Sequence, residues 1–185
     1  NYIGVGSTSV IDDGLIERTV EEITDTEIIW DVGNGVPGSN HKGVNVPGAE
    51  LSRPYISESD RNDILFGIEL GFDIIAASFV RNKEDVLEVR RILDEHNSKM
   101  MIVAKIENMQ GIKNLDEIID VSDGIMVASG DMGVEVPLDE VPVLRKQIIQ
   151  KAVAKGQQVI TATPMLATQI HHPRPTRAEP TTIDK

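Results

Sequence analysis

After residue 43 the chain alternates between short apolar runs and longer segments with helical periodicity. The apolar runs lack the polar–apolar alternation of a half-exposed strand, which is typical of strands buried on both faces. They are residues 73–79, 100–106, 124–128 and 158–161. Strand and helix repeat in units of about 25–35 residues, as in βαβ crossovers. The sequence therefore predicts an α/β fold with a parallel sheet.

Capping residues mark the helices between these runs. Ser57 and Asp60 have the spacing of a capping box, and Gly71 is placed to end the helix that follows. Asn82 is expected to cap a second helix. Two further helices are expected at Leu115–Asp120, capped by Asn114, and at Val143–Lys155, ended by Gly156.

Residues 1–42 follow a different pattern. Short runs rich in Val, Ile, Thr and Trp are separated by turn sequences, which is typical of antiparallel strands. These runs are residues 8–11, 15–23 and 27–32. We expect a β-rich part in residues 1–42, a boundary near Lys42, and an α/β part in residues 43–185.

The composition excludes several classes of protein. The chain has no cysteine, which rules out disulfides and thiolate metal sites and fits a reducing compartment such as the cytoplasm. A net charge of −12 and few aromatic residues argue against nucleic-acid binding. No apolar run approaches the roughly 20 residues that span a bilayer. The first residue is not Met, and we expect a truncated or processed chain.

Polar side chains follow the predicted strands. The βα pattern fits an open doubly wound sheet or part of a closed barrel, and in both the functional groups collect at the carboxyl ends of the strands. Lys105 and Glu107 lie two residues apart at such an end and face the same side. Asp131 follows the next strand and can lie alongside Glu107. Two carboxylates without nearby His or Cys suit Mg²⁺ or Mn²⁺. The alternatives are a structural ion pair and a helix-capping Asp131.

Glycines and a threonine extend this set. Gly130 and Gly133 flank Asp131 and let backbone N–H groups approach an anion, although an ordinary glycine turn has the same pattern. Thr163 follows the last apolar run and can hydrogen-bond a substrate or cap a helix. These residues alone predict a divalent-cation site that handles an oxyanion, and they leave the reaction open.

Several strings of residues resemble the pyruvate kinase family in its order and spacing. They are KGVNVPG (42–48), FGIELGFDIIAASFVR (66–81), AKIENMQG (104–111), SDGIMVASGDMGVEVP (122–137), VITAT (159–163) and HPRPTRAE (172–179). The resemblance implies a (β/α)8 TIM-type barrel with a small β-rich lid domain inserted after its third strand. Residues 1–42 resemble the second half of that lid, and residues 43–185 resemble the barrel from its third to about its seventh strand.

The resemblance also implies a reaction, in which a phosphoryl group moves from phosphoenolpyruvate to ADP to give pyruvate and ATP. Mg²⁺ (or Mn²⁺) and K⁺ are the implied cofactors, with the K⁺ ligands outside this chain. Glu107 and Asp131 resemble the Mg²⁺ ligands, and Lys105 resembles the lysine that steadies the moving phosphoryl group and the enolate. The backbone of Gly130 and Asp131 resembles the cradle of the substrate carboxylate.

Further residues match the family's pattern. Thr163 resembles the threonine implicated in protonating the enolate. Ser78 and Phe79 resemble residues that line the same pocket, and Asp13 and Lys42 match lid and hinge positions near the nucleotide. The implied parent enzyme is a cytoplasmic homo-tetramer with no nucleic-acid or membrane partner.

The sequence also departs from the family. Ser129 stands where the family pattern has arginine, Pro164 stands where it has glutamine, and the match ends after Glu179. Because the family's first and last barrel strands and its carboxyl-terminal domain have no counterpart here, we expect a fragment that is inactive alone. The alternative activity is that of a metal-dependent lyase or aldolase of the phosphoenolpyruvate/pyruvate-binding barrels. Those enzymes share the metal-binding Glu and Asp but lack the lid strands of residues 1–42.

Overall fold

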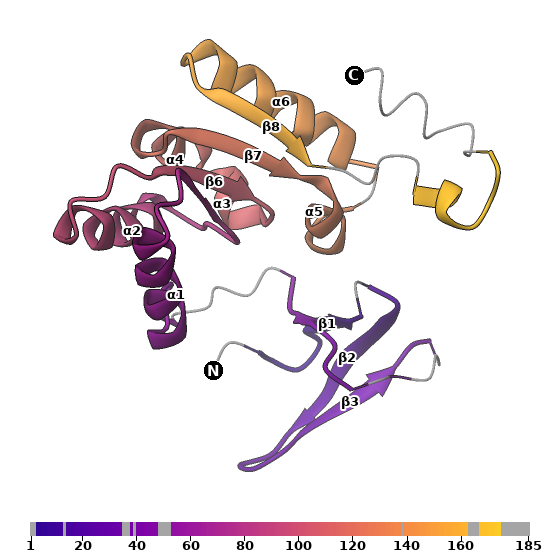
Figure 1. The fold of residues 1–185 in the computed structure, drawn as a ribbon. Coiled ribbons are helices and arrows are strands. Elements are labelled where there is room, and N and C mark those ends of the chain that lie inside the picture. Colours follow the sequence, from indigo (N-terminus) through magenta and orange to yellow (C-terminus); the bar gives the residue numbers. More distant parts are fainter. Residues whose placement is uncertain are drawn as a thin grey trace.

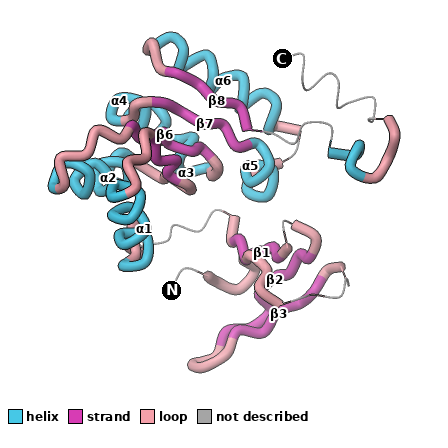
Figure 2. The backbone as a smooth tube through the Cα atoms, in the orientation of Figure 1, coloured by secondary structure: helices cyan, strands magenta, loops and turns pink. Residues whose placement is uncertain are grey.

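The computed structural model describes residues 3–12, 14–34, 38, 40–47, 53–137, 139–162 and 167–174. These residues form two four-stranded sheets, one antiparallel and one parallel (Figure 1). The parallel sheet carries the helices, and the antiparallel sheet is made of strands and loops (Figure 2). The α/β fold with a parallel sheet that the sequence predicts is confirmed.

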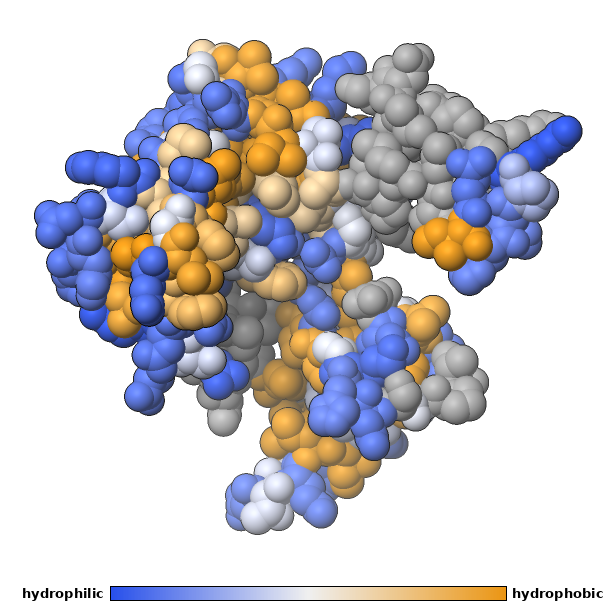
Figure 3. Space-filling model, in the orientation of Figure 1, coloured by the Kyte–Doolittle hydropathy of each residue, from blue (hydrophilic) through white to orange (hydrophobic). Residues whose placement is uncertain are grey.

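The antiparallel sheet has the strand order β3-β2-β1-β4. Its strands are β1 (Thr8–Ile11), β2 (Ile16–Ile23), β3 (Ile28–Val32) and β4 (Val44–Asn45). The first three coincide with the runs predicted in residues 1–42, whereas β4 comes after the expected boundary and still pairs with β1. The division into domains therefore stays a prediction. Several large hydrophobic side chains of β2 and β3 are exposed, and Figure 3 shows hydrophobic residues gathered over this sheet.

The parallel sheet has the strand order β5-β6-β7-β8, so each strand pairs with its neighbour in the sequence. Its strands are β5 (Ile74–Ala77), β6 (Met101–Ile106), β7 (Gly124–Ala128) and β8 (Gln158–Ala162). The register pairs Ala77 with Ala104 and Ile106 with Val127. The carboxyl ends of β5, β6 and β7 therefore meet at one edge of the sheet.

Helices connect these strands. They are α1 (Glu58–Glu69), α2 (Lys83–Glu95), α3 (Met109–Lys113), α4 (Leu115–Val121), α5 (Ser129–Glu135) and α6 (Val141–Ala154), and a 3-10 turn spans Ala167–Ile170. Helices α2, α4 and α6 pack against the strands from one side. None of the described helices is long and apolar enough to cross a membrane.

The predicted helix ends are largely correct. The Ser57 hydroxyl accepts from the Asp60 N–H at 3.1 Å while the Ser57 N–H donates to the Asp60 carboxyl group at 2.9 Å, which is a reciprocal capping box. Gly71 ends α1 with a φ of +71°, which a glycine adopts without strain. The Asn82 side chain caps α2 as predicted. Asn114 occupies the N-cap position of α4, but its side chain forms no cap and donates instead to the Arg81 carbonyl.

Three local features differ from the sequence-based expectation. The short helix α3 begins where the Asn108 side chain accepts from the Gly111 N–H. Helix α5 spans a glycine-containing stretch of low helix propensity, and it is anchored by the buried side chain of Met132. Strand β5 ends at Ala77, two residues before the end of the run predicted at 73–79, because Phe79 has a φ of +54° and leaves the extended conformation.

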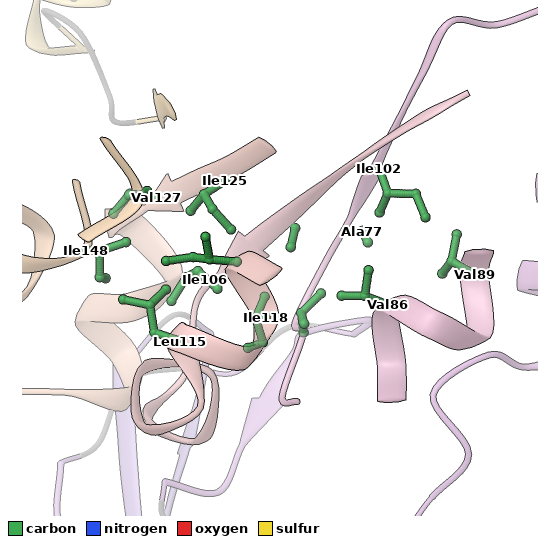
Figure 4. Close-up of a cluster of buried hydrophobic side chains, with 14 of the residues drawn as sticks. Ala77, Val86, Val89, Ile102, Ile106, Leu115, Ile118, Ile125, Val127 and Ile148 are labelled. Atoms are coloured by element: carbon green, nitrogen blue, oxygen red, sulfur yellow. The ribbon is translucent and has the colours of Figure 1, made fainter. Parts of the chain in front are cut away.

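The core lies between the parallel sheet and its helices (Figure 4). Ile102, Ile106 and Ile125 point from the strands toward Val89 of α2 and Ile118 of α4, and all five side chains are almost completely buried. The opposite face of the sheet is open among the described residues. There Ile74 is 49% exposed, Met101 45% and Ile160 44%. The sheet is therefore covered by helices on one face only.

We predict that Leu93→Ala lowers the free energy of unfolding by about 2–5 kcal/mol, because the Leu93 side chain of α2 is fully buried. Leu87→Ala on the same helix is the matched control. The Leu87 side chain is 37% exposed, so its loss costs about 1 kcal/mol or less. Urea denaturation of the full-length protein, followed by circular dichroism, measures both changes. Equal losses from the two variants would contradict the core described here.

Candidate active site

Lys105 and Glu107 meet at the carboxyl end of β6. The Lys105 Nζ atom lies 2.8 Å from Glu107 Oε1 and donates to the Ser78 hydroxyl at 3.0 Å. Ser78 follows β5, so the lysine links the ends of two neighbouring strands. The Glu107 side chain is completely buried, while the Lys105 side chain keeps 22% exposure. The two side chains lie on the same side of the strand end, as their two-residue spacing predicts.

The other carboxyl oxygen of Glu107 is held by the backbone of the β5 loop. The Phe79 N–H donates to Glu107 Oε2 at 2.7 Å. Phe79 has a φ of +54°, a left-handed conformation that is strained for a residue with a side chain. The Phe79 side chain itself is 44% exposed. The backbone of Phe79 therefore fixes Glu107, and its ring stays accessible at the edge of the site.

The Glu107 carboxyl group is incompletely satisfied. Its Oε1 atom is buried and accepts no hydrogen bond of good geometry from the described residues, although Lys105 lies within ion-pair distance. Burial raises the pKa of Glu107, and the Asp131 carboxyl group raises this pKa further. The Lys105 ammonium group and the Phe79 N–H lower this pKa and act in the opposite direction. The structure thus brings Asp131 close enough to interact with Glu107.

Asp131 and Gly130 lie in the first turn of α5, directly after β7. Both residues are exposed, and a Cβ atom built on Gly130 would meet no atom within 4 Å. Space beside this backbone is therefore open. Ser129, at the start of the helix, donates from its hydroxyl to the Ala162 carbonyl at 3.5 Å and connects α5 to the end of β8.

The two carboxyl groups fit a small divalent cation. Mg²⁺ is bound in proteins by one or two carboxylates, with water and substrate oxygens completing its coordination. Glu107 and Asp131 supply such a pair. The Oε1 atom of Glu107, which accepts no hydrogen bond among the described residues, could coordinate a cation. Within the described ranges, no cluster of three or more acidic or histidine side chains surrounds a metal-sized space.

Side chains from distant segments fix the loop 78–81 that carries Ser78 and Phe79. The Tyr55 hydroxyl donates to the Ser78 carbonyl at 2.6 Å, and burial raises the pKa of Tyr55 above its usual value, which keeps the phenol protonated as a donor. At the other end of the loop, Arg81 pairs with the buried Asp85 through both carboxyl oxygens. The contribution of Tyr55 was not predicted, since it lies 23 residues from Ser78 in an irregular segment that carries no pattern.

The remaining predicted residues lie elsewhere or outside the described part. Lys42 forms an ion pair with Asp12 at 2.8 Å, beside the turn that follows β1. Asp13, Thr163 and Pro164 lie outside the described residues. The structure thus brings together Ser78, Phe79, Lys105, Glu107 and Asp131, with Gly130 beside them.

Comparison with known proteins identifies the family. The profile described as "Pyruvate kinase, barrel domain" matches residues 1–184. The chain belongs to the pyruvate kinase family. It is 51% identical over 175 residues to the pyruvate kinase of Clostridium perfringens, a match that covers 94% of this chain and 37% of that protein.

Other pyruvate kinases show similar identity. The chain is 53% identical over 180 residues to the protein of Bacillus licheniformis, covering 96% of this chain and 31% of the relative. It is 51% identical over 180 residues to that of Clostridium acetobutylicum, covering 96% and 38%. The chain therefore spans about a third of the length of the curated pyruvate kinases that it matches.

We predict that Lys105→Met lowers the free energy of unfolding in metal-free buffer at neutral pH by about 1–3 kcal/mol, because it leaves the buried Glu107 carboxyl group without its cation. Adding Glu107→Gln removes the stranded charge and recovers most of that loss. Lys151→Met is the control, since Lys151 and Asp116 form an exposed pair of little energetic weight. Purely additive losses in the double variant would show that the two side chains do not interact.

Proposed function

We propose that the protein carrying this chain is a pyruvate kinase, which transfers a phosphoryl group from phosphoenolpyruvate to ADP and releases pyruvate and ATP. The observation that carries this proposal is the buried Glu107 carboxyl group, with one unsatisfied oxygen, between Lys105 and Asp131. Membership of the family supports it. Phosphoryl transfer depends mainly on positioning and on stabilisation of negative charge, and a lysine beside two carboxyl groups supplies these elements.

We infer that residues 43–185 form part of a (β/α)8 barrel and residues 1–42 part of a lid domain. Two features of the parallel sheet support this inference. Among the described residues, β5 and β8 each pair on one side only. The sheet face that lacks helices exposes Ile74, Met101 and Ile160, as expected for the inner wall of an incomplete barrel.

We infer that Glu107 and Asp131 hold Mg²⁺ or Mn²⁺, and that K⁺ is bound by residues outside this chain. A bound divalent cation would neutralise charge on the phosphoryl and carboxylate oxygens of the substrate. The Phe79 N–H holds Glu107 Oε2 and so turns Oε1 toward Lys105. Oε1, which lies beside Lys105 and accepts no hydrogen bond among the described residues, is the oxygen that we assign to the cation.

We infer that Lys105 stabilises the phosphoryl group during transfer and the enolate that results. Its ammonium group is held by Ser78 and Glu107 and can act as a fixed positive charge without titrating. The backbone of Gly130 and Asp131 would receive the substrate carboxylate in the open space beside α5. Phe79 would line the pocket.

Other roles rest on the resemblance to the family. Thr163 would assist protonation of the enolate, and Asp13 and Lys42 would lie near the nucleotide from the lid side. The parent enzyme would be a homo-tetramer in the cytoplasm.

A metal-dependent lyase or aldolase is the second candidate, because a lysine and two carboxyl groups also serve enolate chemistry. The antiparallel strands β1, β2 and β3 favour the kinase, since the lyase barrels lack this insert. An assay without ADP separates the two. Cleavage of a carbon–carbon bond in the absence of nucleotide would favour the lyase, and pyruvate formation that requires ADP would favour the kinase.

We predict that Lys105→Met and Glu107→Gln each lower kcat for Mg²⁺-dependent pyruvate and ATP formation by at least about 100-fold in the full-length protein, because each removes a charge that acts on the transition state. Lys151→Met, at an exposed position far from the site, serves as the matched control and keeps the rate of the wild type. A coupled assay of pyruvate release measures all three. Unchanged turnover in either site variant would reject the assigned roles.

We also predict that the 185-residue chain expressed alone shows no turnover and self-associates. Among the described residues, β5 and β8 leave two unpaired sheet edges and one sheet face exposes apolar side chains, and these features favour association with other chains. Sedimentation velocity and denaturation of the isolated chain test this. A monomer that unfolds cooperatively would contradict the prediction.

A further inference from the structure

The loops after β5 and β6 are joined by two side chains that are adjacent in the sequence. Glu107 Oε2 accepts from the Phe79 N–H at 2.7 Å, and the next residue, Asn108, donates from its side-chain amide to the Val80 carbonyl at 3.3 Å. These two hydrogen bonds continue the connection between β5 and β6 beyond the point where their ladder ends. The orientation of the Glu107 carboxyl group therefore depends on where the segment Phe79–Val80 lies.

Asn108 is itself rigidly held. Its Oδ1 atom accepts from the Gly111 N–H at 2.8 Å as the cap of α3, so its amide nitrogen necessarily faces the Val80 carbonyl. Gly111 permits this close approach, since a Cβ atom at position 111 would lie 2.5 Å from the Val80 oxygen. Val80 is completely buried. The loop and the first turn of α3 are therefore packed together around one carbonyl group.

Arg81 is held by several contacts, whereas the Val80 carbonyl has one donor within the described part of the chain. Arg81 is fixed by the buried Asp85 through its backbone N–H and its guanidinium group, and its carbonyl also accepts from Asn114 at 2.9 Å. Among the described residues, no donor besides Asn108 reaches the Val80 carbonyl. Loss of the Asn108 amide would therefore leave the Val80 carbonyl without its donor and weaken the positioning of Phe79, whereas loss of the Asn114 amide would leave Arg81 in place.

We propose that Asn108 is a positioning residue for Glu107: its amide fixes the Val80 carbonyl, so that the N–H of the preceding residue, Phe79, holds Oε2 of Glu107 and orients the carboxyl group for binding the divalent cation. This inference rests on the proposed function, in which Glu107 is a metal ligand. Residues that orient a ligand without touching the metal typically change metal affinity by about 10- to 100-fold when they are replaced.

The test measures Mn²⁺ affinity, which does not depend on turnover. Binding to the full-length protein is followed by the electron paramagnetic resonance signal of free Mn²⁺. Asn108→Ser keeps a side-chain oxygen to cap α3 and loses the amide donor. Asn108→Asp keeps the shape and the cap but places an oxygen against the Val80 carbonyl. Asn114→Ser is the matched control, because it removes an amide donor from the same loop at Arg81.

We expect both Asn108 variants to raise the Kd for Mn²⁺ by about tenfold, while Asn114→Ser stays within about twofold of the wild type. The added negative charge of Asn108→Asp by itself would tighten cation binding, so weaker binding in that variant identifies a positional effect. Saturating Mn²⁺ should then restore most of kcat, since Asn108 touches no substrate. Circular dichroism checks the fold of every variant.

Glu107→Gln separates failure of this inference from failure of the proposed function. If Glu107→Gln loses Mn²⁺ binding while both Asn108 variants bind as tightly as the wild type, the positioning role of Asn108 is wrong and the metal role of Glu107 stands. Equal losses in the Asn108 and Asn114 variants would likewise overturn the positioning role, because general loosening of the loop would explain them. If Glu107→Gln binds Mn²⁺ like the wild type, the metal role is wrong and the inference falls with it.

Discussion

The arrangement of the site depends on burial of the Glu107 carboxyl group. Placing a carboxyl group away from water costs free energy unless its oxygens find partners. Here Lys105 and the Phe79 N–H lie close to the two oxygens, and both partners come from residues that the ends of β5 and β6 bring together. One oxygen remains short of a hydrogen bond among the described residues. Such incomplete pairing at a buried carboxyl group is typical of a site that binds a ligand.

The parallel sheet makes this burial possible. Its register aligns the ends of β5, β6 and β7, so that polar residues separated by some 25 positions in the sequence become neighbours. The helices cover one face and form the hydrophobic core there, and the strand ends remain free to carry polar groups. The middle of each strand therefore contributes to the hydrophobic core, and the carboxyl end of the same strand carries the polar groups of the site. This division is general in parallel βα folds.

Much of the architecture could be predicted from the sequence, because the apolar runs and the capping residues are local signals. The strands from β5 to β8 and the helices α1, α2 and α6 were found in this way. The pairing of Lys105 with Glu107 followed from the two-residue period of a strand. The position of Asp131 followed from its place after the next strand.

The rest depends on contacts between residues distant in the sequence. Tyr55 gave no signal, since its partner is a carbonyl group 23 residues away. Asn114 is a residue type that commonly caps helices, but its side chain donates to the Arg81 carbonyl instead, because tertiary packing places that acceptor within reach. The left-handed conformation of Phe79 and the hydrogen bond from its N–H to Glu107 also gave no local signal in the sequence.

The central claim is that Glu107 Oε1, the oxygen beside Lys105, is a metal ligand. Anomalous diffraction from crystals of the full-length protein soaked in Mn²⁺ tests it most directly. The account predicts a single strong anomalous peak within coordination distance of Glu107 Oε1 and the Asp131 carboxyl group, at about 2.1–2.3 Å. A peak at another site, with Glu107 Oε1 fully hydrogen-bonded to Lys105, would contradict the account.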